Sequence, residues 1–246
     1  MAQRFYVPGH YEVSDAVALD SERSNYLSRV LRLPVDAIVE IFNEAGDIWH
    51  CQIVVNNPRK TELKVLSRTP FAEPEAFTLG IALGLIKGQP MDRALAQATE
   101  LGATDIYLMQ AQRSNVKLNE QRMSGKLEHW QKILVASCEQ CGRVRLPRLH
   151  PPQNLVQTLA ELEDPDTHLM YFDPAAVQAP TQLKPQNRVV FVGPEGGFSQ
   201  EEVSAFNRYR VQGCRLGRLT LRAETMPAAA LTLIQQATGW PNSSGP

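Results

Sequence analysis

A strand that runs into a glycine-rich loop places the strongest constraint on how this chain folds. The apolar run Val189–Val192 is dominated by β-branched residues, which favours a buried strand, and it stops where the loop Gly193–Gly197 begins. Ser199 and Glu202 then have the S-x-x-E spacing of a capping box, which predicts the start of a helix. Because the free amide groups of a helix start point back toward the preceding loop, this arrangement predicts a ligand site.

The residues of the loop narrow the kind of ligand. An ordinary glycine turn is an equally good interpretation of Gly196 and Gly197 alone, but such residues also let a ligand approach the backbone closely. The fingerprints GxGxxG and GxxxxGK[ST] are absent, so neither a dinucleotide nor a nucleoside triphosphate is predicted. The carboxylate of Glu195 would repel a polyphosphate, whereas it suits a ligand with positive charge or hydroxyl donors, such as an adenosyl sulfonium.

The stretch that follows, Cys214–Leu231, predicts a second loop and a second helix. Its first half mixes leucines with glycine and polar residues, which indicates an irregular apolar loop rather than a regular element. Thr225 is then placed to cap a helix that tolerates Pro227 in its first turn.

Composition sets outer bounds on the class of protein. A chain of 246 residues that is 43% hydrophobic, with a net charge of -1, is long enough for one large or two modest globular domains. We find no apolar run near the roughly 20 residues of a membrane span and no signal-peptide pattern, so we expect a cytoplasmic protein. The four cysteines suggest neither a disulfide framework nor a metal site, because no second close pair accompanies Cys138 and Cys141.

The middle of the chain is basic although the whole is nearly neutral. Residues 112–148 contain Arg113, Lys117, Arg122, Lys126, Lys132, Arg143, Arg145 and Arg148 against Glu120, Glu128 and Glu139. A solvated helix face is the commoner explanation of such a run taken alone, and contact with nucleic-acid phosphates is the alternative.

The order of apolar runs predicts two domains. Residues 1–70 contain five short strand candidates and one helical stretch around Tyr26–Leu31, which indicates a small closed β-barrel. Residues 71–76, with two acidic residues and a proline, read as a linker. Residues 77–246 alternate strands and helices: the strand 77–86, the helix 91–101, the strand 105–110, a helix from about 120 to 141 and the strand HLMYF (168–172) precede the strand Val189–Val192. This alternation predicts an α/β fold with a mainly parallel sheet and ligand loops at the carboxyl ends of its strands.

Several blocks of the chain, taken in order, resemble the RsmE family of SPOUT methyltransferases, the 16S rRNA uridine-N3 methyltransferases. The blocks are SRVLRL (28–33), QATELGA (97–103), QRSNVK (112–117), EQCGRVRLP (139–147), GPEGGFS (193–199) and LGRLTLRAET (216–225), so the resemblance covers nearly the whole chain. It implies a PUA-like RNA-binding barrel followed by a SPOUT domain, in which the C-terminal segment threads through a loop to form a trefoil knot.

The resemblance also implies an activity and partners. The expected reaction is transfer of a methyl group from S-adenosylmethionine to N3 of a uridine in 16S rRNA of the small ribosomal subunit, by a homodimer without metal. The exposed face of the last helix, with Leu231, Ile234 and Ala237, would serve dimer packing, and burial within one subunit is an equally good interpretation.

Residue roles follow from the family blocks. Because N3 of neutral uridine carries a proton, the enzyme must remove it or stabilise the resulting anion. We expect Arg222 to hold the uracil oxygens or a phosphate, and Glu224 to orient that arginine or accept the proton, although Glu224 is also explained as a first-turn carboxylate favoured by the helix dipole. The expected donor site comprises Val192, Gly193, Glu195, Gly196, Gly197, Leu216, Gly217, Leu219 and Leu221. The expected RNA contacts are Arg4, Arg29, Arg32, Arg113, Lys117 and Arg143, each of which is also explained as an ordinary surface charge.

Three positions depart from the family pattern. Gln97 stands where many members have lysine, Ala223 where they have threonine, and Met226 where they have a small residue, and each can alter a contact in the pocket. Two alternatives therefore stay open: an RNA-binding or ribosome-assembly factor without catalysis, and a SPOUT enzyme that acts on another RNA or another atom of the nucleotide. A Rossmann oxidoreductase is the weakest option, because its fingerprint is missing.

Overall fold

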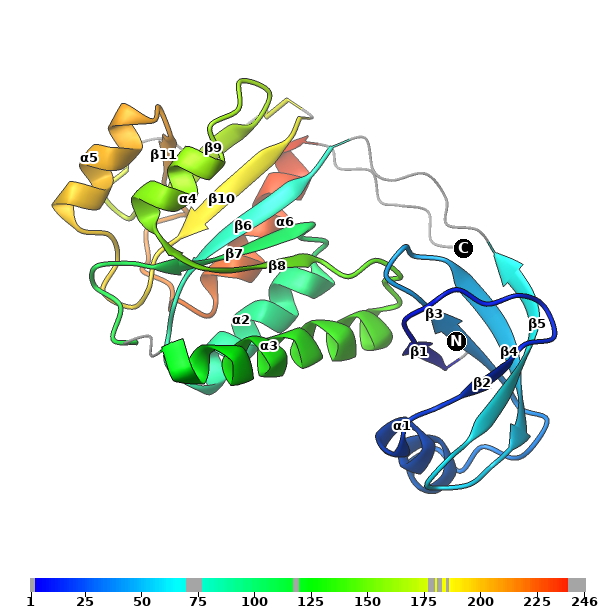
Figure 1. Cartoon of the computed structure of the whole chain (residues 1–246). Coiled ribbons are helices and arrows are strands. Elements are labelled where there is room, and N and C mark those ends of the chain that lie inside the picture. Colours follow the sequence, from blue (N-terminus) through cyan, green and yellow to red (C-terminus); the bar gives the residue numbers. More distant parts are fainter. Residues whose placement is uncertain are drawn as a thin grey trace. The chain divides into compact units, whose positions relative to one another are not determined.

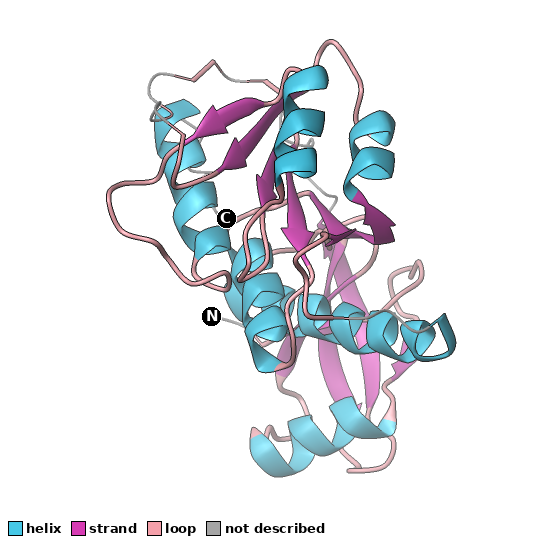
Figure 2. Cartoon of the chain, turned by 90° about the vertical axis from the view of Figure 1, so that its left-hand side faces the viewer, coloured by secondary structure: helices cyan, strands magenta, loops and turns pink. Residues whose placement is uncertain are grey.

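The structure is a computed structural model that describes residues 3–69, 77–116, 120–176, 180, 183–184 and 186–238. The chain divides into two compact units (Figures 1 and 2). Unit 1 comprises Met1–Pro74 together with Val135–Leu146, and unit 2 comprises Glu75–Leu134 together with Pro147–Pro246. No helix in the described ranges is long and apolar enough to cross a membrane.

Unit 1 is built on a five-stranded sheet in the order β1-β3-β4-β5-β2. Its strands are β1 (Arg4–Tyr6), β2 (Ala16–Ala18), β3 (Ile38–Phe42), β4 (Ile48–Val55) and β5 (Glu62–Thr69). β1 pairs with β3 in parallel and the other pairs are antiparallel. Alternate residues of β4, such as Trp49, Cys51 and Ile53, are fully buried, as expected of strands with one face on a core.

A short helical segment covers part of this sheet. α1 (Ser21–Asn25) begins at Asp20, whose carboxylate accepts a hydrogen bond from the Arg23 amide, and continues as the π-helix η1 (Tyr26–Val30). Leu27 is fully buried in the core of unit 1. In the described part of the chain the strand ladder runs from β1 to β2 without closing into a ring, so the closed barrel predicted from the sequence is not completed by strand pairing.

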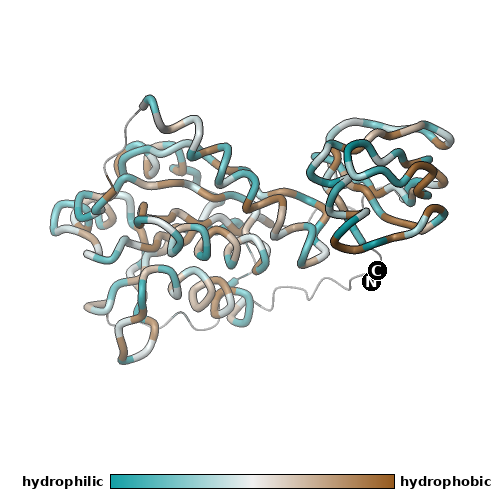
Figure 3. Tube along the Cα trace, turned by 90° about the horizontal axis from the view of Figure 1, so that it is seen from below, coloured by the Kyte–Doolittle hydropathy of each residue, from teal (hydrophilic) through white to brown (hydrophobic). Residues whose placement is uncertain are grey.

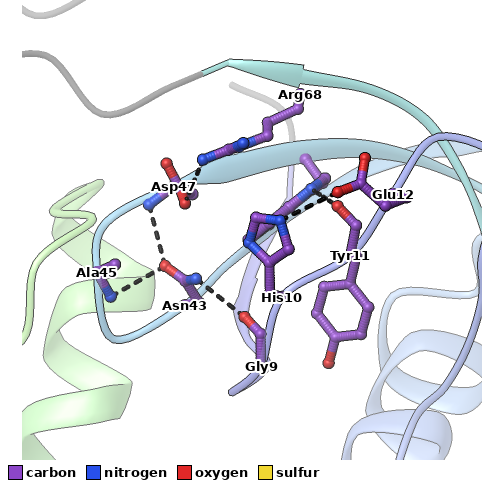
Figure 4. A network of polar contacts seen from close by, with 9 residues as sticks. Gly9, His10, Tyr11, Glu12, Asn43, Ala45, Asp47 and Arg68 are labelled. Carbon is purple, nitrogen blue, oxygen red and sulfur yellow. Dashed lines mark hydrogen bonds and ion pairs between the residues drawn. The ribbon is translucent and has the colours of Figure 1, made fainter.

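The turn between β3 and β4 is fastened to the loop that follows β1 (Figure 4). The Asn43 side chain accepts hydrogen bonds from the amides of Ala45 and Asp47 and donates one to the Gly9 carbonyl. Arg68 in turn donates to Asp47 over 2.8 Å. These contacts hold the turn rigid by satisfying its backbone groups with one asparagine.

The second half of the long helix belongs to unit 1. α3 (Glu120–Cys141) passes into this unit at Val135, and the Glu139 carboxylate there accepts a 2.9 Å hydrogen bond from the Tyr6 amide. Burial raises the pKa of Glu139 above its usual value. The compact units therefore do not follow the simple division of the sequence at residues 71–76, because Val135–Leu146 packs with the N-terminal strands.

Unit 2 is a six-stranded, all-parallel sheet in the order β11-β9-β10-β6-β7-β8. Its strands are β6 (Leu79–Gly84), β7 (Asp105–Gln110), β8 (Arg148–Asn154), β9 (His168–Phe172), β10 (Arg188–Val192) and β11 (Gln212–Cys214). Its helices are α2 (Gln89–Glu100), α4 (Leu155–Glu161), α5 (Gln200–Arg208), α6 (Met226–Thr238) and the part of α3 that ends at Leu134. The parallel α/β architecture predicted from the alternating pattern is confirmed.

Helices cover both faces of this sheet. α2, α6 and the first part of α3 lie on one face, and α4 and α5 lie on the other (Figure 1). The first group shares a hydrophobic cluster with residues such as Val190, and the second group shares another with residues such as Phe191. Because neighbouring residues of β10 point to opposite faces and both faces are covered, the whole strand is buried. Along the coiled segments of the tube in Figure 3, brown hydrophobic residues alternate with teal hydrophilic residues, as expected of helices with one apolar face.

Two strands of the sheet, β8 and β11, are absent from the sequence-based prediction. β8 has the sequence RLHPPQN, whose two prolines argue against a central strand, but β8 lies at the sheet edge, where proline is tolerated. β11 has only three residues and therefore no periodicity to recognise.

Candidate functional site

A cavity of about 520 Å³ opens where β9, β10 and β11 end. Its wall is formed by Phe172 and Val192, the last residues of β9 and β10, and by the segments that follow these strands and β11. The lining residues are Pro90, Phe172, Asp173, Pro174, Val192, Gly193, Pro194, Glu195, Gly197, Phe198, Arg215, Leu216, Gly217, Arg218, Leu219, Thr220, Leu221, Arg222, Ala223, Glu224 and Met226. The carboxyl ends of parallel strands are where α/β sheets bind ligands.

The glycine loop, Gly193–Phe198, forms one wall of the cavity. The amide of Gly197 donates a 2.9 Å hydrogen bond to the carbonyl of Pro194, and Gly197 has φ of +66°, a conformation that favours glycine. The predicted capping box is confirmed: the Ser199 side chain accepts from the Glu202 amide, and the Glu202 carboxylate accepts from the Ser199 amide. The loop is thereby tied to the first turn of α5.

The end of β6 packs directly against the glycine loop at Gly84 and Pro194. A Cβ atom placed on Gly84 would lie 2.6 Å from both the Cδ and the backbone nitrogen of Pro194. Such a distance is far below van der Waals contact, so only glycine fits at this point of β6 while the loop keeps its position.

The leucine loop, Arg215–Ala223, forms the opposite wall. The Arg215 guanidinium donates to the Gly217 carbonyl over 2.8 Å, and Gly217 has φ of +74°. Leu216 and Leu221 are half-buried, whereas the side chain of Leu219 is 82% exposed. An apolar side chain held at a cavity wall is suited to cover the flat face of a ligand ring.

Arg222 and Glu224 lie together at the cavity. The Arg222 Nη1 is 4.0 Å from the Glu224 Oε1, and the Arg93 Nη2 of α2 is 3.8 Å from the same oxygen. The Glu224 side chain is largely buried, whereas the Arg222 side chain is 85% exposed to solvent. The pair therefore places a largely buried acid next to an exposed cation that can meet a substrate.

The structure brings most of the predicted donor-site residues into the cavity wall. Val192, Gly193, Glu195, Gly197, Leu216, Gly217, Leu219 and Leu221 line it, and so do Arg222 and Glu224. Gly196 does not line the cavity, because it faces Arg113: a Cβ on Gly196 would lie 2.8 Å from the Arg113 Cβ. The two positions that depart from the family pattern near this site, Ala223 and Met226, also line the cavity.

The third departing position, Gln97, lies in α2. Its amide oxygen is buried and has no hydrogen-bond partner among the described residues. A buried unsatisfied oxygen costs free energy relative to a satisfied one, so this residue is a local weak point of α2.

Sequence reasoning missed Asp173 as a lining residue. Asp173 follows β9 directly, and its carboxylate accepts a 2.7 Å hydrogen bond from the Ala175 amide. The rule that ligand loops follow strand ends would have found it, because HLMYF was recognised as a strand. Asp173 and Glu195 offer carboxylates in the cavity wall to a ligand with cationic or hydroxyl groups. The same wall also carries the guanidinium groups of Arg215, Arg218 and Arg222.

The predicted RNA contacts have different surroundings. Arg4 in unit 1 is only 14% exposed, forms a 2.6 Å ion pair with Glu40 and donates to the Gly142 carbonyl, so its charge is already engaged. This arrangement does not favour the RNA contact that the sequence predicts for Arg4. Arg29 and Arg32 are exposed, and Arg143 is half-buried.

The remaining two lie in the stretch after β7. Arg113 is exposed and donates a 3.2 Å hydrogen bond to the Gly196 carbonyl. Lys117 lies outside the described residues.

Comparison with known families decides the class of the protein. Residues 73–235 match the family model of an RNA methyltransferase domain, and residues 19–66 match that of an RNA methyltransferase PUA domain. The chain belongs to this family of RNA methyltransferases.

Full-length relatives resemble this RNA methyltransferase throughout. It is 26% identical over 248 residues to the ribosomal RNA small subunit methyltransferase E of Bacillus subtilis, with 96% of this chain and 97% of the relative covered. Over 241 residues it is 29% identical to the protein of the same name from Synechocystis, with 95% and 77% covered.

Solved structures resemble the RNA methyltransferase equally closely. A ribosomal RNA small subunit methyltransferase E from Neisseria gonorrhoeae, bound to S-adenosyl methionine, superimposes with a TM-score of 0.87 at 25% identity and covers 97% of this chain and 98% of its own. A Legionella pneumophila protein described as a methyltransferase, in complex with SAM, gives a TM-score of 0.90 at 26% identity with the same coverage. The RsmE-type fold predicted from the sequence blocks is thus confirmed.

Proposed function

We propose that the protein transfers the methyl group of S-adenosylmethionine to N3 of a specific uridine in 16S rRNA. The observation that carries the proposal is the cavity of about 520 Å³ between the glycine loop and the leucine loop, with Arg222 and Glu224 at its wall. Relatives named ribosomal RNA small subunit methyltransferase E, one of them solved with S-adenosyl methionine bound, support both the donor and the RNA.

The residues of the cavity fit this donor. Its volume lies within the roughly 300–1,000 Å³ typical of sites for small ligands. The carboxylates of Asp173 and Glu195 suit the donor's ammonium, sulfonium and ribose hydroxyl groups, and Leu216, Leu219 and Leu221 offer apolar surface for its adenine. When bound, S-adenosylmethionine supplies an electrophilic methyl group; the chain's own residues must hold it and exclude competing nucleophiles.

The acceptor needs help of a different kind. A neutral uracil must lose the proton on N3 before the nitrogen lone pair is free to accept a methyl group, and the negative charge then spreads onto the two neighbouring carbonyl oxygens. The exposed guanidinium of Arg222 is placed to stabilise those oxygens, and a positive group near developing negative charge lowers the barrier. Glu224 is placed to orient Arg222 or to take the proton.

RNA binding is assigned to both units. In unit 1 the exposed Arg29 and Arg32 fit phosphate contact, with Arg143 as a third cation, and in unit 2 the exposed Arg113 fits it. Lys117 stays in the proposal on the sequence alone. We propose the functional division 1–70 for RNA binding, 71–76 as linker and 77–246 for methyl transfer, although Val135–Leu146 packs with unit 1.

We also propose a homodimer that works in the cytoplasm, where ribosomal subunits are assembled. Leu231 and Ile234 are buried within the subunit, at 0% and 1% exposure, so they do not form the dimer surface that the sequence allowed for them. A second, shallow and largely apolar hollow offers a better surface. It is lined by Arg215, Leu216, Gly217, Ala228, Ala229, Thr232, Leu233 and Gln236. Because it includes the base of the leucine loop, a partner there would adjoin the cavity.

Transfer of labelled methyl from S-adenosylmethionine to small ribosomal subunits that lack the modification tests this function. Label in the 16S rRNA supports the proposal. A folded protein that binds the RNA but transfers no label would instead identify a binding or assembly factor. Label that appears only with other RNAs would leave the donor in place and overturn the acceptor.

A further inference from the structure

Two loops of unit 2 meet above the end of β6. The arginine loop, Ala111–Val116, follows β7, and the glycine loop follows β10; in the sheet order, β7 and β10 flank β6. The Ser114 hydroxyl donates a 2.6 Å hydrogen bond to the carbonyl of Leu85, just past the end of β6. The arginine loop is thus anchored to the same strand end that supports the glycine loop.

The two loops touch at Gly196 and Arg113. A Cβ on Gly196 would lie 2.8 Å from the Arg113 Cβ and 3.1 Å from the Arg113 carbonyl oxygen, so any side chain there would push the loops apart. The guanidinium of Arg113 donates to the Gly196 carbonyl over 3.2 Å. Because the Gly196 backbone packs directly against the Cβ and the carbonyl oxygen of Arg113, the position of one loop depends on that of the other.

The buried carboxylate of Glu202 also links the arginine loop to the end of the glycine loop. Glu202 is only 4% exposed, and its Oε2 accepts from the Ser199 amide over 2.7 Å while its Oε1 accepts from the Gln112 amide over 2.9 Å. A capping box explains the first bond but not the second, which comes from the arginine loop. The helix N-terminus favours the negative charge at this place, so the carboxylate is well suited to bridge two backbone amides.

We propose that Glu202 and Gly196 are positioning residues that fasten the arginine loop to the glycine loop, so that methyl-donor binding and RNA binding strengthen each other. The inference rests on the proposed function, because it takes the cavity as the donor site and Arg113 as an RNA contact. A donor that contacts the glycine loop would, through Glu202 and Gly196, also hold the loop that presents Arg113 to RNA. Linkage requires the effect to be reciprocal and equal in both directions.

The coupling is measured as the ratio of the RNA dissociation constant without the donor-site ligand to the RNA dissociation constant with that ligand. The RNA is a 16S rRNA fragment that the wild type methylates, and the donor-site ligand is S-adenosylhomocysteine, which carries no methyl group and allows equilibrium. We expect S-adenosylhomocysteine to lower the dissociation constant for RNA by at least about fivefold in the wild type. The RNA should tighten binding of the compound by the same factor, and a ratio of one in the wild type would overturn the proposal.

Glu202→Gln tests the bridge. The amide group of glutamine can accept only one of the two hydrogen bonds and turns its own N–H toward the second amide, so the coupling ratio should fall toward one. Glu201→Gln is the matched control, because Glu201 is an exposed carboxylate in the same turn of α5 that contacts only the Ser199 side chain among the contacts described. Unfolding midpoints of both variants show whether the fold is kept.

Gly196→Ala tests the contact without changing a charge. The added Cβ should separate the loops and lower the coupling ratio as well. Gly125→Ala should leave the coupling ratio unchanged, because no atom lies within 4 Å of a Cβ there. Arg113→Ala should lower RNA affinity less in the Gly196→Ala background than in the wild type. In that background Arg113 is already displaced from the position in which it contacts RNA.

The outcomes separate this inference from the proposed function. If the wild type binds neither donor nor RNA, the function is wrong. If the wild type methylates 16S rRNA and shows the coupling, but both Glu202→Gln and Gly196→Ala retain it in full, the positioning role is wrong while the function stands.

Discussion

Arg222 and Glu224 form an unequal pair at the cavity: the guanidinium is 85% exposed, the carboxylate 16%, and their charged atoms lie 4.0 Å apart. An exposed cation beside a largely buried acid fits a role in which the arginine meets the substrate and the glutamate orients the arginine. The pair gains little stability from its own attraction, because one partner is screened by solvent. Its value is therefore expected in catalysis and not in folding.

Replacing Arg222 with alanine should lower the methyl-transfer rate by about 100- to 1,000-fold, because the positive group beside the developing oxyanion is lost. Donor affinity should stay within about twofold, since the donor contacts assigned to the two loops remain. Single-turnover transfer and calorimetric titration of S-adenosylhomocysteine measure the two quantities. Arg208→Ala, an exposed arginine at the end of α5, is the matched control. Undiminished transfer in Arg222→Ala would refute the assigned role.

Replacing Gly84 with alanine should weaken donor binding from a distance. The added Cβ would meet Pro194 at 2.6 Å, so either β6 or the glycine loop must move. We expect a loss of about 1–3 kcal/mol in the free energy of unfolding, as is usual for overpacking, together with weaker donor affinity. Urea unfolding and donor titration are the measurements, and Gly125→Ala, where the new Cβ meets no atom within 4 Å, is the control for donor affinity. Wild-type donor affinity in Gly84→Ala would show that the loop does not depend on this contact.

Asp105 should contribute to the loss of folding stability at acid pH. Burial by itself raises the pKa of this carboxyl, but hydrogen bonds from His150, Thr104 and Arg148 outweigh burial and hold the pKa below its usual value of 3.8. A depressed pKa in the folded state means that the stabilisation is present above the unfolded pKa and is lost as pH falls through the folded one. The free energy of unfolding of the wild type, measured with urea, should therefore fall more steeply below about pH 4 than that of Asp105→Asn. Parallel curves for the two proteins would contradict this assignment.

The cysteines should differ sharply in reactivity. Burial raises the pKa of Cys51 and Cys138 to about 12 and that of Cys214 to about 11, whereas Cys141 is exposed. At pH 8 a thiol of pKa 12 is ionised in roughly one molecule in ten thousand, and the thiolate is the reactive form. Iodoacetamide at pH 8 should modify Cys141 first, as peptide mass spectrometry can show. Equal labelling of Cys138 in the folded protein would indicate that the end of α3 opens readily.

The sequence predicted those parts of the fold that carry a strong local signal. The buried strands β6, β9 and β10, the long helix α3 and the capping box at Ser199 all have a clear period or spacing, and all are found. β8 and β11 were missed because their existence depends on neighbours in the sheet and not on their own residues. The threading of the C-terminal segment into a trefoil knot stays a prediction.

The candidate site divides in the same way. Motif spacing predicted which loops enclose the cavity, since each follows a recognisable strand or precedes a recognisable helix. It could not predict that Gly196 faces Arg113, because residues far apart in sequence meet there only in the folded sheet. Arg4 is the counterpart in unit 1: its ion pair with Glu40 arises from the parallel register of β1 and β3, which no local pattern encodes.

The most direct test of the account is the identity of the nucleoside that the protein methylates. Small ribosomal subunits lacking the modification are incubated with the enzyme and S-adenosylmethionine, and the 16S rRNA is digested and analysed by mass spectrometry. We expect one new species, N3-methyluridine, which is absent when Arg222→Ala replaces the wild type. A methyl group on any other nucleoside or atom would contradict the assignment of the acceptor, even with the donor site correct.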